Sequence, residues 1–155
     1  MTAATSLRVY TGTNAATESA AQTAIALLSV DAATDDPNSH RIAAGANSYE
    51  KWVRVKIDTT AGTTLANFSV ERGGDLADGV VIRMGVTDNP VTPTSRTSTV
   101  ATTTMVAGRR YVFDATPIGA TGEYSRYLVI QEQVAATAPS GAIEQQVFTI
   151  GYAES

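Results

Sequence analysis

The stretch YEKWVRVKID (residues 49–58) alternates apolar and polar side chains with the period of a β-strand. One parity carries Val53, Val55 and Ile57, while the other carries charged residues together with Trp52, the only tryptophan of the chain. The pattern predicts a half-buried strand that places its apolar parity in a core. It also places Trp52 on the polar face, where so large an apolar ring needs some cover.

Segments with the same alternation recur along the chain, each bounded by Gly, Pro, Asn, Asp or Ser. Besides residues 49–58 and a strand around Ile42, we expect strands in SLRVYT (6–11), ANFSVER (66–72), GVVIRMGVT (79–87), STVATTTM (98–105), RRYVFDA (109–115), SRYLVIQEQV (125–134) and EQQVFTIGY (144–152). The run AIALLSV (24–30) fits a buried strand or, with a capping box at Ser19 and Gln22, a short helix; the all-β context favours the strand.

This spacing of about nine strands predicts an all-β fold, a β-sandwich that is either immunoglobulin-like or jelly-roll-like. A length of 155 residues fits one domain over residues 1–155, and MTAATS (1–6) is expected to form a flexible N-terminal arm. Residues 87–104 are rich in threonine, and we expect an exposed loop that leads into an edge strand. The alternative is a projecting loop that contacts a partner.

Composition argues against several classes of partner. The formal net charge is −4 and the sequence pI is about 4.9, whereas binding to nucleic acid needs a concentrated basic patch. The chain contains no cysteine, shows no secretory signal and has no apolar run long enough for a membrane span. We therefore expect a protein made in a cytoplasm that binds neither nucleic acid nor membrane.

Residues that could carry chemistry are few. The only histidine, His40, lies in a turn-like stretch, and no nucleophile-elbow motif accompanies it. The oxygen-rich group Asp31, Asp35, Asp36 and Asn38 does not have the spacing of a calcium loop, and these residue types are common turn formers. We expect no catalytic residues, no metal and no cofactor, and hence no enzyme.

Three interpretations of Trp52 remain open from the sequence. A loop or a β-bulge could bury the ring locally. The ring could instead form a partner-binding surface with Arg54 and Lys56, because Trp and Arg are enriched in interface hot spots. Finally, it could stack on a sugar, although no neighbouring aromatic residue shares its parity in this strand.

Two stretches, KWVRVKIDTTAGTTLANFSVER (51–72) and YLVIQEQVAATAPSGAIEQQVFTIGYAES (127–155), resemble small β-sandwich proteins of tailed-phage virions, in which a Pro-x-Gly turn leads into the last long strand. The turn here is Pro139-Ser140-Gly141. The acidic, cysteine-free, Ala/Thr-rich chain is similar in style to capsid decoration (cement) proteins. This resemblance implies a bacteriophage structural protein located in the virion, a homo-oligomer such as a homotrimer, that binds the major capsid protein or another virion protein. The alternatives are a tail-tube or minor tail protein and a carbohydrate-binding β-sandwich module.

Overall fold

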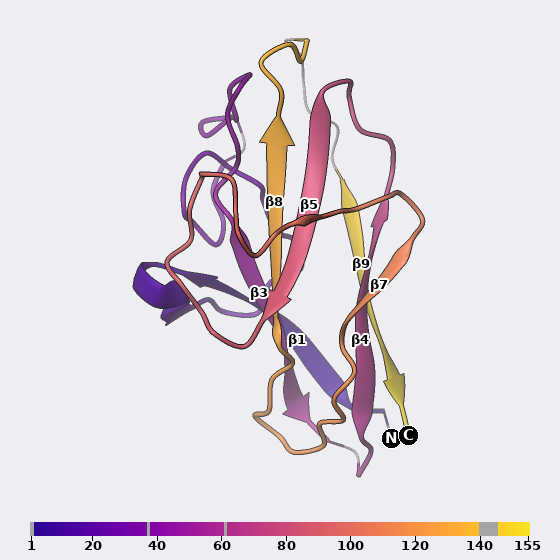
Figure 1. Cartoon of the computed structure of the whole chain (residues 1–155). Helices are drawn as coiled ribbons and strands as arrows, with labels where there is room; N and C mark the ends of the chain where they lie inside the picture. The colour runs from indigo at the N-terminus through magenta and orange to yellow at the C-terminus, as the bar shows by residue number, and fades with distance from the viewer. Residues whose placement is uncertain (1, 37, 61, 140–145) are drawn as a thin grey trace.

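The computed structural model describes residues 2–36, 38–60, 62–139 and 146–155. These ranges contain nine strands, which form two antiparallel sheets packed face to face (Figure 1). The elements are β1 (Ala4–Thr11), the short 3₁₀ turn η1 (Thr13–Ala15), β2 (Thr17–Glu18), β3 (Lys51–Thr59), β4 (Leu65–Gly73), β5 (Val80–Thr87), β6 (Thr103–Thr104), β7 (Arg110–Asp114), β8 (Tyr127–Val134) and β9 (Val147–Glu154). The prediction of an all-β sandwich is confirmed.

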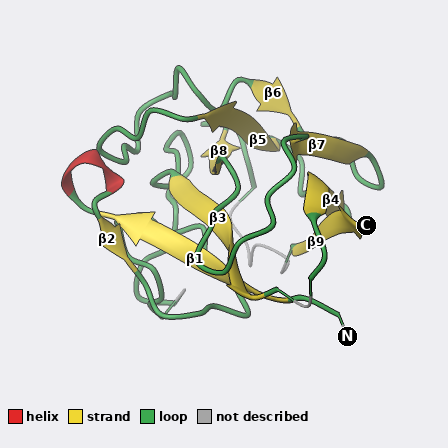
Figure 2. Cartoon of the chain, turned by 90° about the horizontal axis from the view of Figure 1, so that it is seen from below, coloured by secondary structure: helices red, strands yellow, loops and turns green. Residues whose placement is uncertain are grey.

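The larger sheet has the strand order β2-β1-β3-β8-β5-β6, and the smaller sheet has the order β7-β4-β9. Figure 2, which looks along the sandwich, shows the smaller sheet facing one side of the larger. The apolar parity of β3 that the sequence indicated lies between the sheets, with Val53, Val55 and Ile57 all buried. Phe68 of β4 and Phe113 of β7 meet them from the smaller sheet. Burial of these alternating side chains is the main stabilising contribution to the fold.

β3 occupies a central position, and this position determines the surroundings of Trp52. Its neighbours are β1 on one side and β8 on the other, so that Trp52 pairs with Tyr10 and with Val129. The burial of β8 is nearly continuous, with its first six residues all buried. A strand with both faces covered has this pattern, which means that the larger sheet is covered on its outer face as well.

Two expected strands are absent. The run at residues 24–30 and the segment around Ile42 have no strand assignment, although Leu28 and Ile42 are buried and Ile25 packs against the core. These segments contribute apolar side chains and isolated backbone hydrogen bonds, such as that from Ser29 to the carbonyl of His40, but they lack the lateral ladder that defines a strand. The expected strand at residues 98–105 shrinks to Thr103–Thr104, and the two-residue strand β2 was not expected at all.

The expected N-terminal arm is wrong for most of its length. Ala4 to Ser6 form the start of β1 and pair with β3. Ala3 is buried in the core, and its backbone N–H donates a hydrogen bond to Oε1 of Glu154 at 2.9 Å. This hydrogen bond joins residues near the two ends of the described chain; Met1 lies outside the described residues.

Candidate functional site

Trp52 is completely buried, with an exposed fraction of 0 %. Its indole N–H donates a hydrogen bond to Oε2 of Glu50 at 3.0 Å, and its ring meets that of Tyr127 edge to face at 5.6 Å. The ring of Tyr10 also meets that of Tyr127 edge to face, with 5.2 Å between the ring centres. These rings form a second apolar cluster, on the outer face of the larger sheet, together with Ala15 and Ala101.

Residues 88–102, which connect β5 to β6 and are here called the cover segment, close this cluster from outside. Figure 1 shows the cover segment, in pink to orange, crossing the larger sheet. The carbonyl of Thr94 accepts hydrogen bonds from the backbone N–H of Glu50 at 3.0 Å and from Nε2 of Gln131 at 3.3 Å. Gln131 is fully buried, so its amide fixes the cover segment to β8.

The interpretation of Trp52 as an exposed partner-binding residue is therefore wrong, and local burial by a loop is what the structure shows. The Thr-rich segment does not project; it folds back onto the sheet. The alternation of residues 49–58 predicted that the charged parity of β3 faces water, but the cover segment buries Trp52 on that face. Arg54 and Lys56 lie on the same face but are only half-buried, so they remain candidates for partner contact.

Both cations lie against Tyr124, in the connection between β7 and β8. The guanidinium carbon of Arg54 is 4.8 Å from the centre of the Tyr124 ring and 4.7 Å from that of Tyr127, and Nζ of Lys56 is 5.4 Å from Tyr124. At these distances a cation is attracted by the negative face of an aromatic ring. The hydroxyl of Tyr124 donates to Oε2 of Glu18 at 3.0 Å, so the aromatic ring links the cations to β2.

Glu18 also accepts a hydrogen bond from the hydroxyl of Tyr10, at 3.0 Å. Burial, followed by this hydrogen bond and the charge of Glu18, raises the pKa of Tyr10 well above its usual range. Tyr10 is thus held in its neutral form. It serves as a donor that holds β2 in place and is not poised for proton transfer near neutral pH.

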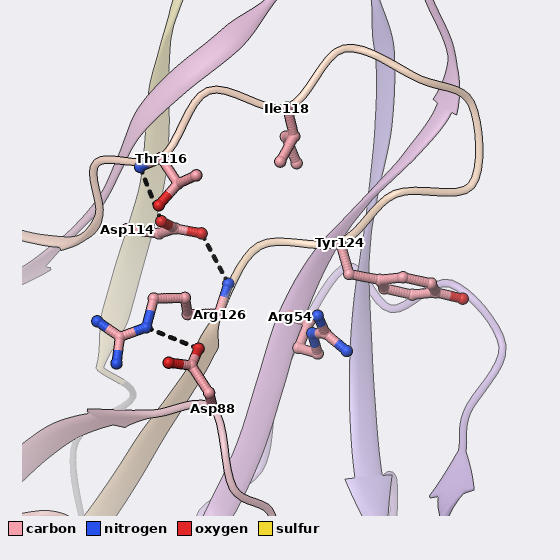
Figure 3. Close-up of a pocket in the computed structure, with 7 residues that line it drawn as sticks. All are labelled: Arg54, Asp88, Asp114, Thr116, Ile118, Tyr124 and Arg126. Carbon is pink, nitrogen blue, oxygen red and sulfur yellow. Dashed lines mark hydrogen bonds and ion pairs between the residues drawn. The ribbon is translucent and has the colours of Figure 1, made fainter.

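A pocket of about 470 Å³ opens beside Arg54. Its lining comprises Arg54, Asp88, Asp114, Thr116, Ile118, Tyr124 and Arg126. Figure 3 shows Arg54 and Tyr124 on one side of this space and the pair Arg126–Asp88 on the other. We call it the Arg54 pocket.

The two carboxylates of the Arg54 pocket are already engaged. Asp114, which is 4 % exposed, accepts the backbone N–H groups of Thr116 at 2.9 Å and Arg126 at 2.8 Å. Asp88 forms a 2.8 Å ion pair with Nε of Arg126. Because Asp114 ties together the two ends of the β7–β8 connection, its role in this pocket is structural.

The sequence-based reasoning found Arg54 but missed the other pocket residues, which come from three different segments. One local signal existed: Asp114 at the end of a strand and Thr116 two positions later have the spacing of an Asx turn. That spacing predicts a turn but no pocket, because nothing in it indicates that Arg54 lies nearby.

Of the remaining candidates, Asp31 accepts a hydrogen bond from the backbone N–H of Gly12 at 2.8 Å, whereas those between Asp35 and His40 form local turns. Nε2 of His40 lies 3.0 Å from Oδ2 of Asp35, and Asp36 accepts hydrogen bonds from Asn38 and Ser39. These hydrogen bonds, with the Asn38 backbone N–H as the largest cause, lower the pKa of Asp36. Within the described ranges, no three His, Asp or Glu side chains are grouped so as to hold a metal ion, and no helix is long and apolar enough to cross a membrane.

Two ionisable side chains are buried at one end of the core. Lys51 is fully buried and donates from Nζ to the carbonyl of Ala32 at 2.5 Å; burial lowers its pKa to about 8. Glu132 is 3 % exposed, its Oε1 atom has no hydrogen-bond partner among the described residues, and burial raises its pKa to about 7. The unpaired Glu132 carboxylate is thus a destabilising feature whenever it is ionised.

We expect Glu132 to make stability depend on pH. The folded protein binds the Glu132 proton more tightly than the unfolded chain does, so stability should fall as pH rises from about 4.5 to about 7 and then level off. Glu132→Gln should remove this slope and raise the free energy of unfolding at pH 7.5 by up to about 3 kcal/mol, with little effect at pH 4. Urea unfolding between pH 4 and 7.5 measures it; Glu71→Gln, on the outer face of β4, is the control. An unchanged slope in Glu132→Gln would contradict the assignment.

No protein-family model matches this sequence, and neither a curated protein nor a solved structure matches it.

Proposed function

We propose that the protein is a non-enzymatic structural protein of a tailed-phage virion, a capsid decoration protein that self-associates and binds the major capsid protein on the assembled head. The observation that carries this proposal is the edge strand β9, whose outer side has no strand partner among the described residues. A protein that binds only the assembled lattice stabilises that lattice by mass action.

β9 pairs with β4 along one side only, and its other side has no strand partner within the described ranges. The strand is eight residues long, contains no proline, and carries its only charge, Glu154, at its last position. Soluble proteins usually protect such an edge with lysine, proline, a bulge or a covering segment; the β4–β9 ladder has one register shift, between Ala66 and Ser69 of β4, and no lysine or proline on β9. An unprotected edge of this length favours pairing with another chain.

Exposed valines lie at both edges of the smaller sheet, whose strand order is β7-β4-β9. Val147 of β9 is 61 % exposed and Val112 of β7 is 54 % exposed, and both point away from the core of the smaller sheet. Val106, just before β7, is 55 % exposed. Val147 lies at the open edge of β9, so its burial would add to the free energy of the backbone hydrogen bonds that a partner strand would form there.

The other functions expected from the sequence receive less support. A carbohydrate-binding module needs exposed aromatic rings, whereas every strongly exposed large hydrophobic residue in the described ranges is a valine. Catalysis receives no support from the Arg54 pocket, because both of its carboxylates are held by N–H groups or by Arg126. A tail-tube or minor tail protein would use the same edge, but in a ring.

The mass of the purified protein and its binding to heads test this proposal. We expect light scattering to give a small closed oligomer of the 16.2 kDa chain, such as a trimer. The oligomer should cosediment with assembled heads of the phage that carries its gene and not with the unassembled capsid protein.

Val147→Lys should weaken association by roughly tenfold or more, because a lysine protects the edge. Val91→Lys is the matched control, since Val91 is 48 % exposed but lies in the cover segment. A monomer that does not cosediment with heads would refute the proposal. A ring-shaped oligomer that stacks into tubes would favour the tail protein.

A further inference from the structure

Arg54 is the cation of its pocket that lacks a carboxylate partner. The ion pairs of the described residues include Arg126 with Asp88 but none for Arg54. The Nε atom of Arg54 donates to the carbonyl of Ser125 at 2.5 Å, and its two Nη atoms have no acceptor within the described part of the chain. A half-buried guanidinium with four unused N–H donors is a site that can accept an anion.

The Arg54 side chain is held in position before any ligand arrives. The Ser125 carbonyl fixes Nε, and the rings of Tyr124 and Tyr127 lie on the guanidinium at less than 5 Å. Fixing a long side chain in advance removes much of the entropy cost that ligand binding would otherwise carry. The Nη end is the part of the fork that remains available to a ligand.

The charges of the pocket favour a singly charged anion over a doubly charged one, because the lining is neutral in sum and Arg54 is its only guanidinium without an ion pair among the described residues. Its lining contains two arginines and two aspartates, and the pair Arg126–Asp88 is neutral. A phosphate with two charges would be repelled by Asp88 and Asp114, whereas a carboxylate matches a single guanidinium in both charge and planar shape. The volume of about 470 Å³ also has room for an apolar group beside Ile118 and Tyr124.

We propose that the Arg54 pocket binds a carboxylate group, with the Nη atoms of Arg54 as the bidentate donors and Ile118 and Tyr124 contacting the apolar part of the ligand. The carboxylate belongs either to a small free acid or to an acidic side chain of a partner protein. This site uses none of the residues of the β9 edge, so the proposal does not depend on a role in the virion.

Two pairs of probes distinguish the sources of the carboxylate. The first pair is phenylacetate and its neutral analogue phenylacetamide, and the second is the acetylated, amidated tripeptide Ala-Glu-Ala and its counterpart Ala-Gln-Ala. Nuclear magnetic resonance of the backbone N–H groups of Tyr124 and Arg126, two residues that line the pocket, measures the affinity of the intact chain and of its variants for each. We expect the carboxylate member of at least one pair to bind about tenfold more tightly than its amide. Binding of the tripeptide alone would indicate a protein ligand, and binding of phenylacetate alone a free acid.

Variants of the pocket provide the controls. Arg54→Lys keeps the positive charge but loses the planar guanidinium with its paired N–H donors, and should weaken carboxylate binding by about tenfold. Arg109→Lys is the matched control, because the Arg109 guanidinium also lies over a ring, 5.1 Å from Tyr111, but outside the pocket. Should Arg54→Lys fold poorly, Thr116→Glu supplies a competing carboxylate from an exposed position and should abolish binding, whereas Thr116→Gln should not. Equal affinity for acids and amides, or binding unaffected by both Arg54→Lys and Thr116→Glu, would overturn the proposal.

Discussion

Replacing Trp52 by alanine should lower the free energy of unfolding by about 3–5 kcal/mol, the range found for large-to-small substitutions in a core. The ring is completely buried between β3 and the cover segment, and its removal would leave a cavity bordered by Tyr127 and Ala101. Glu50 would in addition lose the donor of its 3.0 Å hydrogen bond. Chemical denaturation followed by far-ultraviolet circular dichroism measures the loss.

Trp52→Phe separates the two contributions. It keeps an aromatic ring against Tyr127 but removes the indole N–H that Glu50 accepts, so it should cost less than alanine, roughly 1–3 kcal/mol. A Trp52→Ala protein with nearly unchanged unfolding but weakened self-association would contradict the buried position and restore an interface role for this residue.

Gly85→Ala should release the cover segment from the sheet. A Cβ atom on Gly85 would lie 1.7 Å from the carbonyl oxygen of Val100, a contact that cannot exist without movement of the backbone. Because the obstacle is backbone and not a flexible side chain, we expect a loss at or above the upper end of the roughly 1–3 kcal/mol typical of overpacking. The emission of Trp52, the only tryptophan, should shift to longer wavelength while the sheets remain folded.

Gly73→Ala is the control for that experiment. Gly73 also lies in a strand, but a Cβ there would meet its nearest atom, the Val147 carbonyl oxygen, at an ordinary 3.8 Å. We expect its Trp52 emission to match that of the unmodified protein. A Gly85→Ala protein with native emission and native stability would show that the cover segment does not approach β5 this closely.

The sequence predicted the sheets far better than it predicted what covers them. Alternation located β5 and β8 to within a residue or two at each end, because each strand places one parity in the core. It misassigned residues 24–30, whose apolar side chains cover the core without belonging to a ladder. Periodicity reports burial, and burial of an extended segment does not require a strand partner.

The candidate site was predictable only in part, for a related reason. The alternation of residues 49–58 correctly separated Trp52 and Arg54 from the core-facing valines, but it could not identify what lies over them. Tyr124 lies 70 positions after Arg54, and the cover segment begins 36 positions after Trp52. The continuous apolar run of β8 was the available hint that the sheet is covered on both faces.

The contact between Ala3 and Glu154 has a consequence for engineering the chain. The two ends lie side by side at the same end of the sandwich (Figure 1). A short flexible linker could therefore join them into a circular backbone without displacing β1 or β9. Cyclisation would restrict chiefly the unfolded chain, whose ends are otherwise free to separate. A circular permutant could then be made by placing new termini in an exposed turn, such as that at Gly108.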